Sequence, residues 1–256
     1  MERVLADSVE SASKYIMAGK VLGNNQPQNK PGRLVGGTSE IGVLESKAYV
    51  GRGALKLKSA IACFKPLLHE KICADVGSST GGFTEVLLEE GAAKVYAIDV
   101  GYGELDWKLR KDNRVVVMER TNARTLQSLP EKIDFASIDV SFISLKLILP
   151  SVISWLNEKG EILALIKPQF EAEVEDVGSG GVIKDQSIHK RVLQDLLFWC
   201  RQQGLSVTGL VPSKLLGAKG NQEYFIRLSL GEKDQSSIEE MIEVCFERLK
   251  QSQVCD

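Results

Sequence analysis

From Ala54 to Leu230 the chain alternates between short apolar runs and segments with apolar residues at helical spacing, and this alternation constrains the fold most. Strands that alternate with helices pair mainly in parallel, because the helices cover both faces of the sheet. The sequence therefore predicts an α/β fold. The expected strands cover residues 71–76, 94–100, 114–118, 133–139, 161–166, 205–211 and 224–230, and the expected helices cover 54–64, 83–90, 105–110, 150–156 and 187–203.

Residues 1–46 follow a different pattern, which predicts a small module ahead of the α/β part at 54–256, with a linker at 47–53. Short apolar pieces there are separated by Gly, Asn and Pro residues that are typical of turns. The elements expected in this module are a helix over about 8–18 and small strands at 21–22 and 41–44.

The formal net charge of −2 hides an uneven distribution of charge along the chain. Residues 1–70 hold ten Lys or Arg and six Asp or Glu, whereas residues 231–256 hold three and seven. A uniformly basic nucleic-acid binder is excluded, but the basic N-terminal part suits contact with phosphates. Apolar residues at helical spacing from 238 to 249 predict a helix that packs on the core, with partner binding as the less favoured alternative.

Membrane, secreted and metal-binding classes are disfavoured by the composition. No apolar run approaches the roughly 18 residues of a spanning helix, and charged residues among the first ten argue against a secretory signal. The five cysteines have no CxxC spacing, so reduced thiols are expected instead of disulfides or a zinc site. We therefore expect a cytoplasmic protein without a metal centre.

The glycine-rich stretch DVGSSTGGF at residues 75–83 leaves a predicted strand and enters a predicted helix. Glycines permit a tight turn and close approach of a ligand, and N–H groups at the start of the helix would face that ligand. The next strand ends at Asp99, about 20 residues further on, where an acid commonly binds ribose hydroxyls. These features predict a nucleoside-cofactor site. The expected cofactor-binding residues are Asp75, Gly77, Ser79, Thr80, Gly81, Gly82, Phe83, Asp99 and Val100.

The order of the glycines indicates which cofactor is favoured. The stretch lacks the Gly-Lys-Ser/Thr ending of a P-loop, which argues against a nucleoside triphosphatase. Its spacing also departs from G-x-G-x-x-G, which disfavours a nicotinamide enzyme. A D-x-G-x-x-x-G-G-F loop resembles the first motif of S-adenosylmethionine-dependent methyltransferases, and this resemblance implies S-adenosylmethionine as the cofactor.

Four charged residues flank the same predicted edge of the sheet. Asp139 ends the fourth strand and Lys167 follows the fifth, where open α/β folds bind ligands. A lysine directly after a buried run is costly to bury unless it is paired, and Asp139 is its expected partner. Lys56, in the first helix of the α/β part, and Glu223, just before the last strand, complete the candidate catalytic set.

Several segments, taken in order, resemble the TlyA family, also labelled hemolysin A, which has an FtsJ-like ribose methyltransferase domain. The segments are GRGALKL, DVGSSTGGFTEVLLEEGA, VYAIDVGYGELDWKLR, RVVVMERTNAR, IDFASIDVSFISLKLILP, LIKPQFE and GNQEYF. The resemblance implies a Rossmann-like fold with a mostly parallel, seven-stranded sheet whose last strand is antiparallel. It also implies methylation of a ribose 2′ oxygen in ribosomal RNA, at cytidine, by a Lys-Asp-Lys-Glu tetrad that matches Lys56, Asp139, Lys167 and Glu223.

The same resemblance implies that residues 1–46 form an S-four-type RNA-binding module. The family has a further helix before this point, so the module is expected to be shortened. The implied partner is ribosomal RNA or a ribosomal subunit. Phosphate contacts are expected from Lys14, Lys20, Lys30, Arg33 and Arg52.

The tetrad suits transfer of a methyl group to a hydroxyl. A lysine acts as a general base only when burial or a neighbouring cation destabilises its charged form. We hypothesise that Lys167 accepts the ribose proton and that Lys56 assists it and steadies the developing alkoxide. Asp139 and Glu223 would orient the two lysines.

Three other function classes remain as alternatives to this enzyme: a membrane-active hemolysin, a non-catalytic RNA-binding assembly factor and a nicotinamide enzyme. Residues 172–185 are either a lid over RNA or an ordinary connection. Tyr102 and Trp107 are candidates to stack on adenine, although core packing is the favoured prediction for Trp107. Structural roles are also expected for His69, His189 and Glu171, the last by shaping the following loop.

Overall fold

A computed structural model describes residues 8–17, 21–23, 26–28, 30–33, 35–36, 39, 41–43, 49–178, 180–231 and 236–253. The chain forms two compact units, residues 1–48 and 49–256. Residues 49–53, which the sequence places in a linker, therefore belong to the second unit.

The first unit contains one helix and a small sheet. The helix α1 covers Val9–Met17, and the strands are β1 (Val21–Gly23), β2 (Gln26–Gln28) and β3 (Ile41–Val43). Both β2 and β3 pair with β1 in antiparallel orientation. The sequence predicts α1, β1 and β3 but misses β2, because its Gln-Pro-Gln sequence has no apolar alternation.

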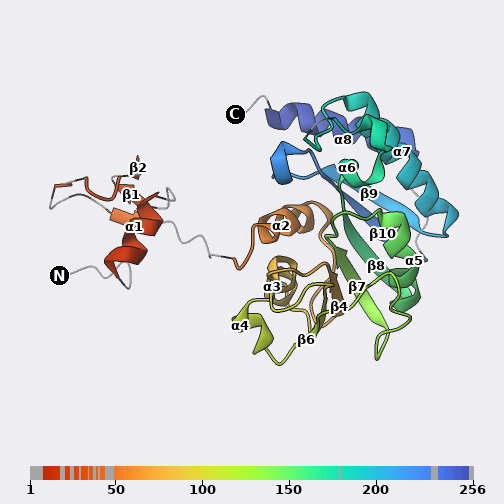
Figure 1. Ribbon diagram of the computed structural model, residues 1–256, viewed down its shortest axis with the longest axis horizontal. Helices are drawn as coiled ribbons and strands as arrows, with labels where there is room; N and C mark the ends of the chain where they lie inside the picture. The colour runs from red at the N-terminus through yellow and green to blue at the C-terminus, as the bar shows by residue number, and fades with distance from the viewer. Residues whose placement is uncertain are drawn as a thin grey trace. The chain divides into compact units, whose positions relative to one another are not determined.

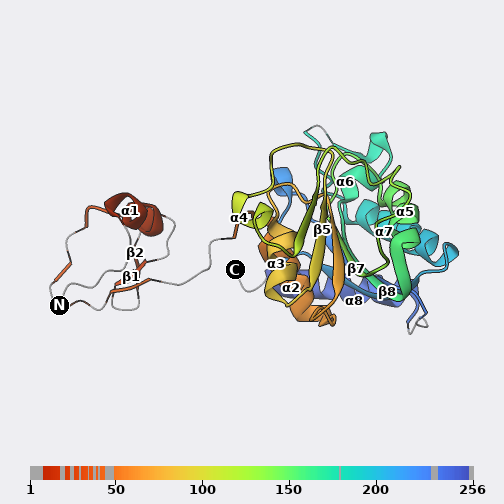
Figure 2. The same ribbon diagram turned by 90° about the horizontal axis from the view of Figure 1, so that it is seen from below.

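The second unit is built on the seven-stranded sheet that the resemblance implies (Figures 1 and 2). The strand order is β6-β5-β4-β7-β8-β10-β9, and β10 is antiparallel to both of its neighbours while the other pairs are parallel. The strands are β4 (Ile72–Val76), β5 (Lys94–Ile98), β6 (Val115–Met118), β7 (Ile133–Ile138), β8 (Leu156–Ile166), β9 (Ser206–Pro212) and β10 (Tyr224–Ser229).

Helices cover both faces of this sheet (Figure 1). One apolar cluster joins α2, α3 and the region of α4 to the sheet, and a second joins α5, α7 and α8 to its other face. The helices are α2 (Gly53–Phe64), α3 (Gly82–Glu89), α4 (Trp107–Arg110), α5 (Leu145–Trp155), α6 (Pro168–Glu171), α7 (Gln186–Gln202) and α8 (Ile238–Gln253), with 3₁₀ turns η1 (Val174–Asp176) and η2 (Ala218–Gly220).

The region around Pro150 differs from the sequence prediction. Helix α5 begins at Leu145, with Ser144 as its N-cap, and carries Pro150 in its interior. A proline is typical of the first turn, and this preference misplaced the start of the helix. The burial of Leu145 and Leu149 outweighs the hydrogen bond that the proline removes.

The C-terminal helix packs on the core, as its apolar spacing predicts. Its buried side chains are Ile238, Ile242, Cys245, Phe246 and Leu249. Among the described residues, none of the helices has the length and apolarity that a membrane span requires.

Candidate active site

The glycine-rich loop connects the end of β4 to the start of α3 and touches the end of β7. Gly77 adopts a φ of 85°, which favours glycine. A Cβ on Gly77 would lie 2.4 Å from the backbone oxygen of Asp139, so a side chain does not fit there. The loop is therefore packed tightly against Asp139, the residue that follows β7.

Two of the expected cofactor-binding residues, Asp75 and Gly81, support the glycine-rich loop through buried contacts. Asp75 is fully buried and lines neither of the two cavities that flank the loop; it accepts a hydrogen bond from Thr84 Oγ1 at 2.6 Å. Burial raises the pKa of Asp75 to about 7. Gly81 is the N-cap of α3, and its φ of 96° brings it against Leu105 and Leu109.

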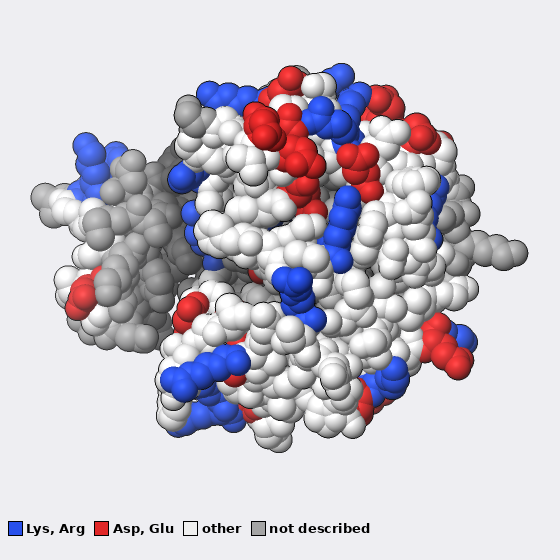
Figure 3. All heavy atoms as spheres, turned by 45° about the vertical axis from the view of Figure 1, so that its right-hand side comes forward, with Lys and Arg blue, Asp and Glu red and all other residues white. Residues whose placement is uncertain are grey.

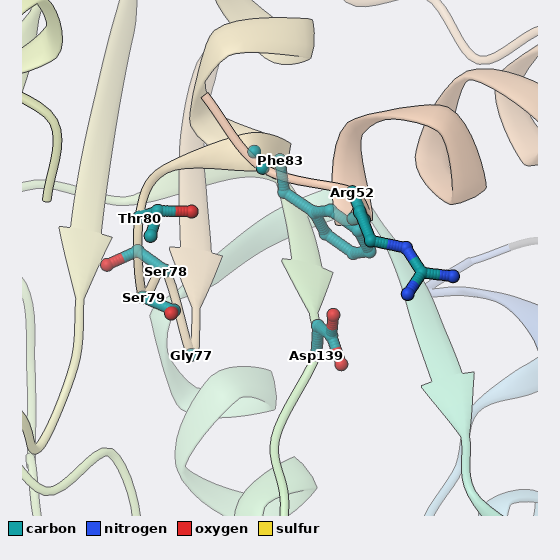
Figure 4. Close-up of a pocket in the computed structure, with 10 residues that line it drawn as sticks. Arg52, Gly77, Ser78, Ser79, Thr80, Phe83 and Asp139 are labelled. Atoms are coloured by element: carbon teal, nitrogen blue, oxygen red, sulfur yellow. The ribbon is translucent and has the colours of Figure 1, made fainter. Parts of the chain in front are cut away.

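The two cavities differ in size. One, of about 210 Å³, is shown in Figure 4, where Ser78, Ser79 and Thr80 lie on one side and Arg52 and Asp139 on the other. The second has about 500 Å³. The two cavities share Gly77, Ser79 and Asp139 as lining residues. Phe83 and Gly82 also line the first cavity, while Asp99 and Val100 line the second.

Asp99 lines the larger cavity and holds two of the loops around it. Its Oδ2 accepts a hydrogen bond from Ser79 N at 2.7 Å, and its Oδ1 accepts one from Gly101 N at 2.7 Å. The carboxylate thus fixes two loops and still lines the cavity. Each of its oxygens retains acceptor capacity, as ribose recognition requires.

The predicted cofactor-binding set did not include several residues that line the larger cavity. They follow β6 and β7, at the same edge as the predicted site: Thr121, Asn122, Ala123, Val140, Ser141, Phe142 and Ile143. The signal was present, since the residues that follow every parallel strand meet at this edge.

The four candidate catalytic residues form two ion pairs. Lys167 Nζ lies 2.6 Å from Asp139 Oδ1, and Lys56 Nζ donates to Glu223 Oε2 at 2.6 Å. All four side chains are at most 21% exposed. Burial raises the pKa of Glu223, while the hydrogen bond and charge of Lys56 and the charge of Lys167 oppose that rise. The pairs therefore act on each other electrostatically.

The first ion pair retains unused hydrogen-bonding capacity. Lys167 Nζ donates to Ser141 Oγ at 2.8 Å. Asp139 Oδ1 is buried and accepts no hydrogen bond of standard geometry, although Lys167 lies beside it. The Lys167 ammonium therefore compensates the charge on this oxygen.

The reversed direction of β10 explains how Glu223 joins the other three. Asp139 and Lys167 follow β7 and β8, whose carboxyl ends meet at one edge of the sheet. Because β10 is antiparallel to β8, its first residues lie at that same edge, with Tyr224 opposite Ile166. Glu223 immediately precedes β10, and Lys56 approaches from α2.

The predicted RNA-binding residues are only partly described by the structure. Lys30 and Arg33 are exposed, and Arg33 donates to Gln28 Oε1 at 3.2 Å. Lys20 and the side chain of Lys14 lie outside the described residues. Arg52, by contrast, is exposed at the rim of the smaller cavity.

Three residues interpreted as structural have clear contacts. His189 is buried between Ile183 O, 3.0 Å from its Nε2, and the hydroxyl of Tyr224. Glu171 contacts the start of α5 instead of shaping the following loop, because it accepts hydrogen bonds from Leu145 N at 2.7 Å and Ser144 Oγ at 2.6 Å. His69 is exposed and lies against Gly91.

The prediction that Trp107 packs in the core is wrong. Trp107 is 66% exposed at the start of the four-residue helix α4, and the Lys111 ammonium lies 4.6 Å from its ring centre. Leu109 occupies the buried position of this short helix instead. Tyr102 is also exposed, and the Arg120 guanidinium carbon lies 4.1 Å from its ring centre. Neither Trp107 nor Tyr102 lines the cavities beside the glycine-rich loop.

The described cysteines are all free thiols. Cys63, Cys73, Cys200 and Cys245 are free, and Cys255 lies outside the described residues. In the described part of the chain, no group of three or more His, Cys, Asp or Glu side chains is arranged to hold a metal ion.

Comparisons with known proteins point to one family. A model of the FtsJ-like methyltransferase family matches residues 49–230. The 16S/23S rRNA (cytidine-2′-O)-methyltransferase TlyA of Mycobacterium tuberculosis is 42% identical over 89% of this chain and 87% of its own length. A solved structure described as a hemolysin from Streptococcus thermophilus superposes with a TM-score of 0.75 and 40% identity, over 97% of this chain and 94% of that one. At 15% identity, an S-adenosylmethionine-dependent methyltransferase from Listeria monocytogenes shares the fold, with a TM-score of 0.53 over 71% of this chain and 100% of that one.

Proposed function

Because the chain belongs to the FtsJ-like methyltransferases and, within them, to the TlyA family, we propose that it methylates the ribose 2′ oxygen of cytidine in ribosomal RNA. The methyl donor is S-adenosylmethionine. The observation that carries the proposal is the Asp139–Lys167 ion pair, because its Asp139 lines both cavities beside the glycine-rich loop.

The residues around this loop fit S-adenosylmethionine. The larger cavity, with Asp99 on its floor, suits the adenosine part, since a carboxylate accepts hydrogen bonds from ribose hydroxyls. The smaller cavity, lined in part by Ser78, Thr80 and Arg52, suits the amino-acid part. Asp139 lines both cavities and contributes negative charge beside them.

The tetrad residues divide the work of proton transfer. Bound S-adenosylmethionine supplies a methyl group that is electrophilic because it is attached to a sulfonium. Lys167 is our candidate to accept the ribose proton, since it follows β8 and contacts both Ser141 and Asp139, which line the larger cavity. Lys56, held by Glu223, adds a second cation that would favour the developing alkoxide.

An exposed phenylalanine, Phe142, packed against the partly buried Phe170, suits a nucleotide substrate. Phe142 is 90% exposed with a φ of 63°, and its ring centre lies 4.9 Å from that of Phe170. An exposed ring in a strained conformation offers a face on which an unstacked base can lie. We infer that the target base stacks here while its ribose faces Lys167.

The first unit would supply additional RNA affinity through Lys30 and Arg33, which are exposed. A protein with this substrate acts in the cytoplasm, where ribosomes are assembled. Comparing methyl transfer to free RNA with transfer to whole subunits decides in which form the enzyme meets its substrate.

The proposal is tested by tritiated-methyl transfer from S-adenosylmethionine to purified ribosomal subunits and to naked ribosomal RNA, with the modified ribose then mapped. We expect incorporation at a cytidine 2′ oxygen, and a loss of roughly 100-fold or more in Lys167→Ala, as for removal of a general base. Calorimetry should show S-adenosylmethionine binding to this variant close to that of the parent protein.

Three kinds of result would contradict the proposal. Absence of incorporation into any subunit or RNA would exclude this activity. Tight binding of a nicotinamide dinucleotide would favour an oxidoreductase, and leakage of liposomes without cofactor would favour a membrane-active hemolysin. Near-parent transfer by Lys167→Ala would show that Lys167 is not the base.

A further inference from the structure

Glu223 is held closely by the loop that precedes it, residues 213–222. Ser213 N donates to Glu223 O at 2.8 Å, so the start of the loop returns to the residue at its end. Gly217 lies against the Glu223 carboxylate, where a Cβ would be 1.9 Å from Oε1. The place of this carboxylate, and therefore its contact with Lys56, depends on where Gly217 lies.

Asn221 closes the turn that contains Gly217. Gly217 N donates to Asn221 O at 2.8 Å, and Asn221 N donates to Ala218 O at 3.2 Å. These bonds join the two ends of residues 217–221. A displacement of Asn221 would thus move Gly217 and release the Glu223 carboxylate.

The side chain of Asn221 ties this turn to the glycine-rich segment 180–184. Asn221 is 3% exposed, and its Oδ1 accepts from Ile183 N at 3.2 Å while its Nδ2 donates to Gly181 O at 2.8 Å. Buried polar groups that lose such partners are strongly destabilised, so the two segments are held together at this point.

A second set of hydrogen bonds joins the segment 180–184 to Tyr224, the residue after Glu223. Ile183 O accepts a hydrogen bond from His189 Nε2 at 3.0 Å, and Tyr224 OH donates to His189 Nδ1 at 3.1 Å. Burial lowers the pKa of His189, which favours the neutral ring that these two bonds require. Tyr224 directly follows Glu223, so the segment is bound to the chain on both sides of that residue.

We propose that Asn221 is a positioning residue that fixes Glu223 against Lys56 by holding the turn 217–221 to the segment 180–184. The proposal rests on the proposed function, because it assigns Asn221 a part in the same reaction. Asn221 contacts neither Lys56 nor Lys167 in this role; it acts through Gly217 and the Glu223 carboxylate. Residues 181–183 then serve as a fixed support for the tetrad and not as a lid.

The test compares Asn221→Ala with Asn157→Ala. Asn157 is a matched control, since its side chain also donates to a neighbouring element, Asp134 Oδ1 at 2.6 Å, but lies at the start of β8, the opposite end of the sheet. In Asn221→Ala we expect kcat for methyl transfer to fall about 10- to 100-fold, as for a displaced catalytic group. The KM for RNA and the Kd for S-adenosylmethionine should stay within about twofold of the parent values, and Asn157→Ala should keep all three.

Hydrogen exchange supplies a readout that does not need activity. Residues 180–184 and 217–221 should exchange faster in Asn221→Ala and at the parent rate in Asn157→Ala. Unchanged exchange there, or an unchanged kcat despite faster exchange, would overturn the positioning role. A parent protein without methyl transfer would instead refute the proposed function, and the exchange result would still decide whether Asn221 holds the turn.

Gly217→Ala keeps the proposal testable if Asn221→Ala fails to fold. The φ of Gly217 is −72°, which suits alanine, so the effect of the added methyl group arises from its contact with the Glu223 carboxylate. We expect the same loss of kcat with the Asn221 hydrogen bonds intact and S-adenosylmethionine binding preserved. A parent-like kcat in Gly217→Ala would show that the position of Glu223 does not depend on this turn.

Discussion

Gly77 is the point at which the glycine-rich loop meets Asp139. Gly77 has a φ of 85°, and a Cβ there would meet the backbone of Asp139 at 2.4 Å. The two causes that exclude a side chain, conformation and space, can be separated because Gly204 has a similar φ of 78° with no atom within 4 Å of its Cβ position.

Gly77→Ala and Gly204→Ala should therefore differ. Both substitutions place alanine in a left-handed conformation, which costs roughly 1–2 kcal/mol of unfolding free energy. Gly77→Ala should cost more, because the β4–α3 loop must also move away from β7, and it should weaken S-adenosylmethionine binding by about tenfold or more. Urea unfolding and calorimetry measure both effects. Equal effects of the two variants on both measurements would show that the contact with Asp139 is unimportant.

The buried carboxyl group of Asp75 should make the folded protein less stable as the pH rises towards neutral. Burial raises its pKa from 3.8 to about 7, so the folded protein keeps a proton that the unfolded chain loses. Its contribution to stability is therefore full below about pH 4 and decreases as the pH rises towards 7. Asp75→Asn should remove this decrease and gain stability relative to the parent protein at pH 8. Asp195→Asn, at an exposed position, is the control and should leave the pH profile unchanged.

At the scale of elements, the sequence predicts an element best where a single physical effect determines where that element begins and ends. The parallel strands were predictable because short apolar runs between turn residues are typical of buried strands, and the pairing of Asp139 with Lys167 followed from adjacent strand ends. Helix α5 was misplaced because the local preference of Pro150 competed with the burial of Leu145 and Leu149. Local pattern favoured one start and tertiary packing imposed another.

The parts of the site that could not be predicted depend on contacts between distant elements. Nothing near Trp107 in the sequence indicates that α4 has only four residues and leaves the indole exposed. Likewise, the support of Glu223 by Gly217 and Asn221 arises only after the 213–222 loop has folded back on itself. The pairing of Asp139 with Lys167 was predictable, but the residues that hold Glu223 in place were not.

At the scale of the whole molecule, charge is uneven along the chain but does not follow the two compact units, since residues 1–48 hold six Lys or Arg and five Asp or Glu. The basic excess lies in residues 1–70 and the acidic excess in residues 231–256. Figure 3 shows acidic side chains gathered towards the top of the view, while its lower half has large uncharged areas. RNA affinity is therefore expected to depend on particular cations and not on the net charge.

Salt dependence of RNA binding tests this distribution. Replacing Lys30 and Arg33 together by alanine should reduce the slope of log K against log salt by about 1 for each phosphate that the variant no longer neutralises. Lys159→Ala, at the start of β8 and away from the catalytic edge, should leave the slope unchanged. Identical slopes for all three proteins would remove the first unit from the RNA interface.

The position of β10 has a consequence for how the protein is made. Lys56 and Glu223 are 167 residues apart in the sequence, and β10 inserts between β8 and β9, which are both synthesised before it. A nascent chain whose β10 has not yet emerged from the ribosome cannot complete the tetrad, even when the rest of the unit has folded. The ribosome that synthesises this protein is therefore not exposed to its activity until translation of the catalytic unit is almost finished.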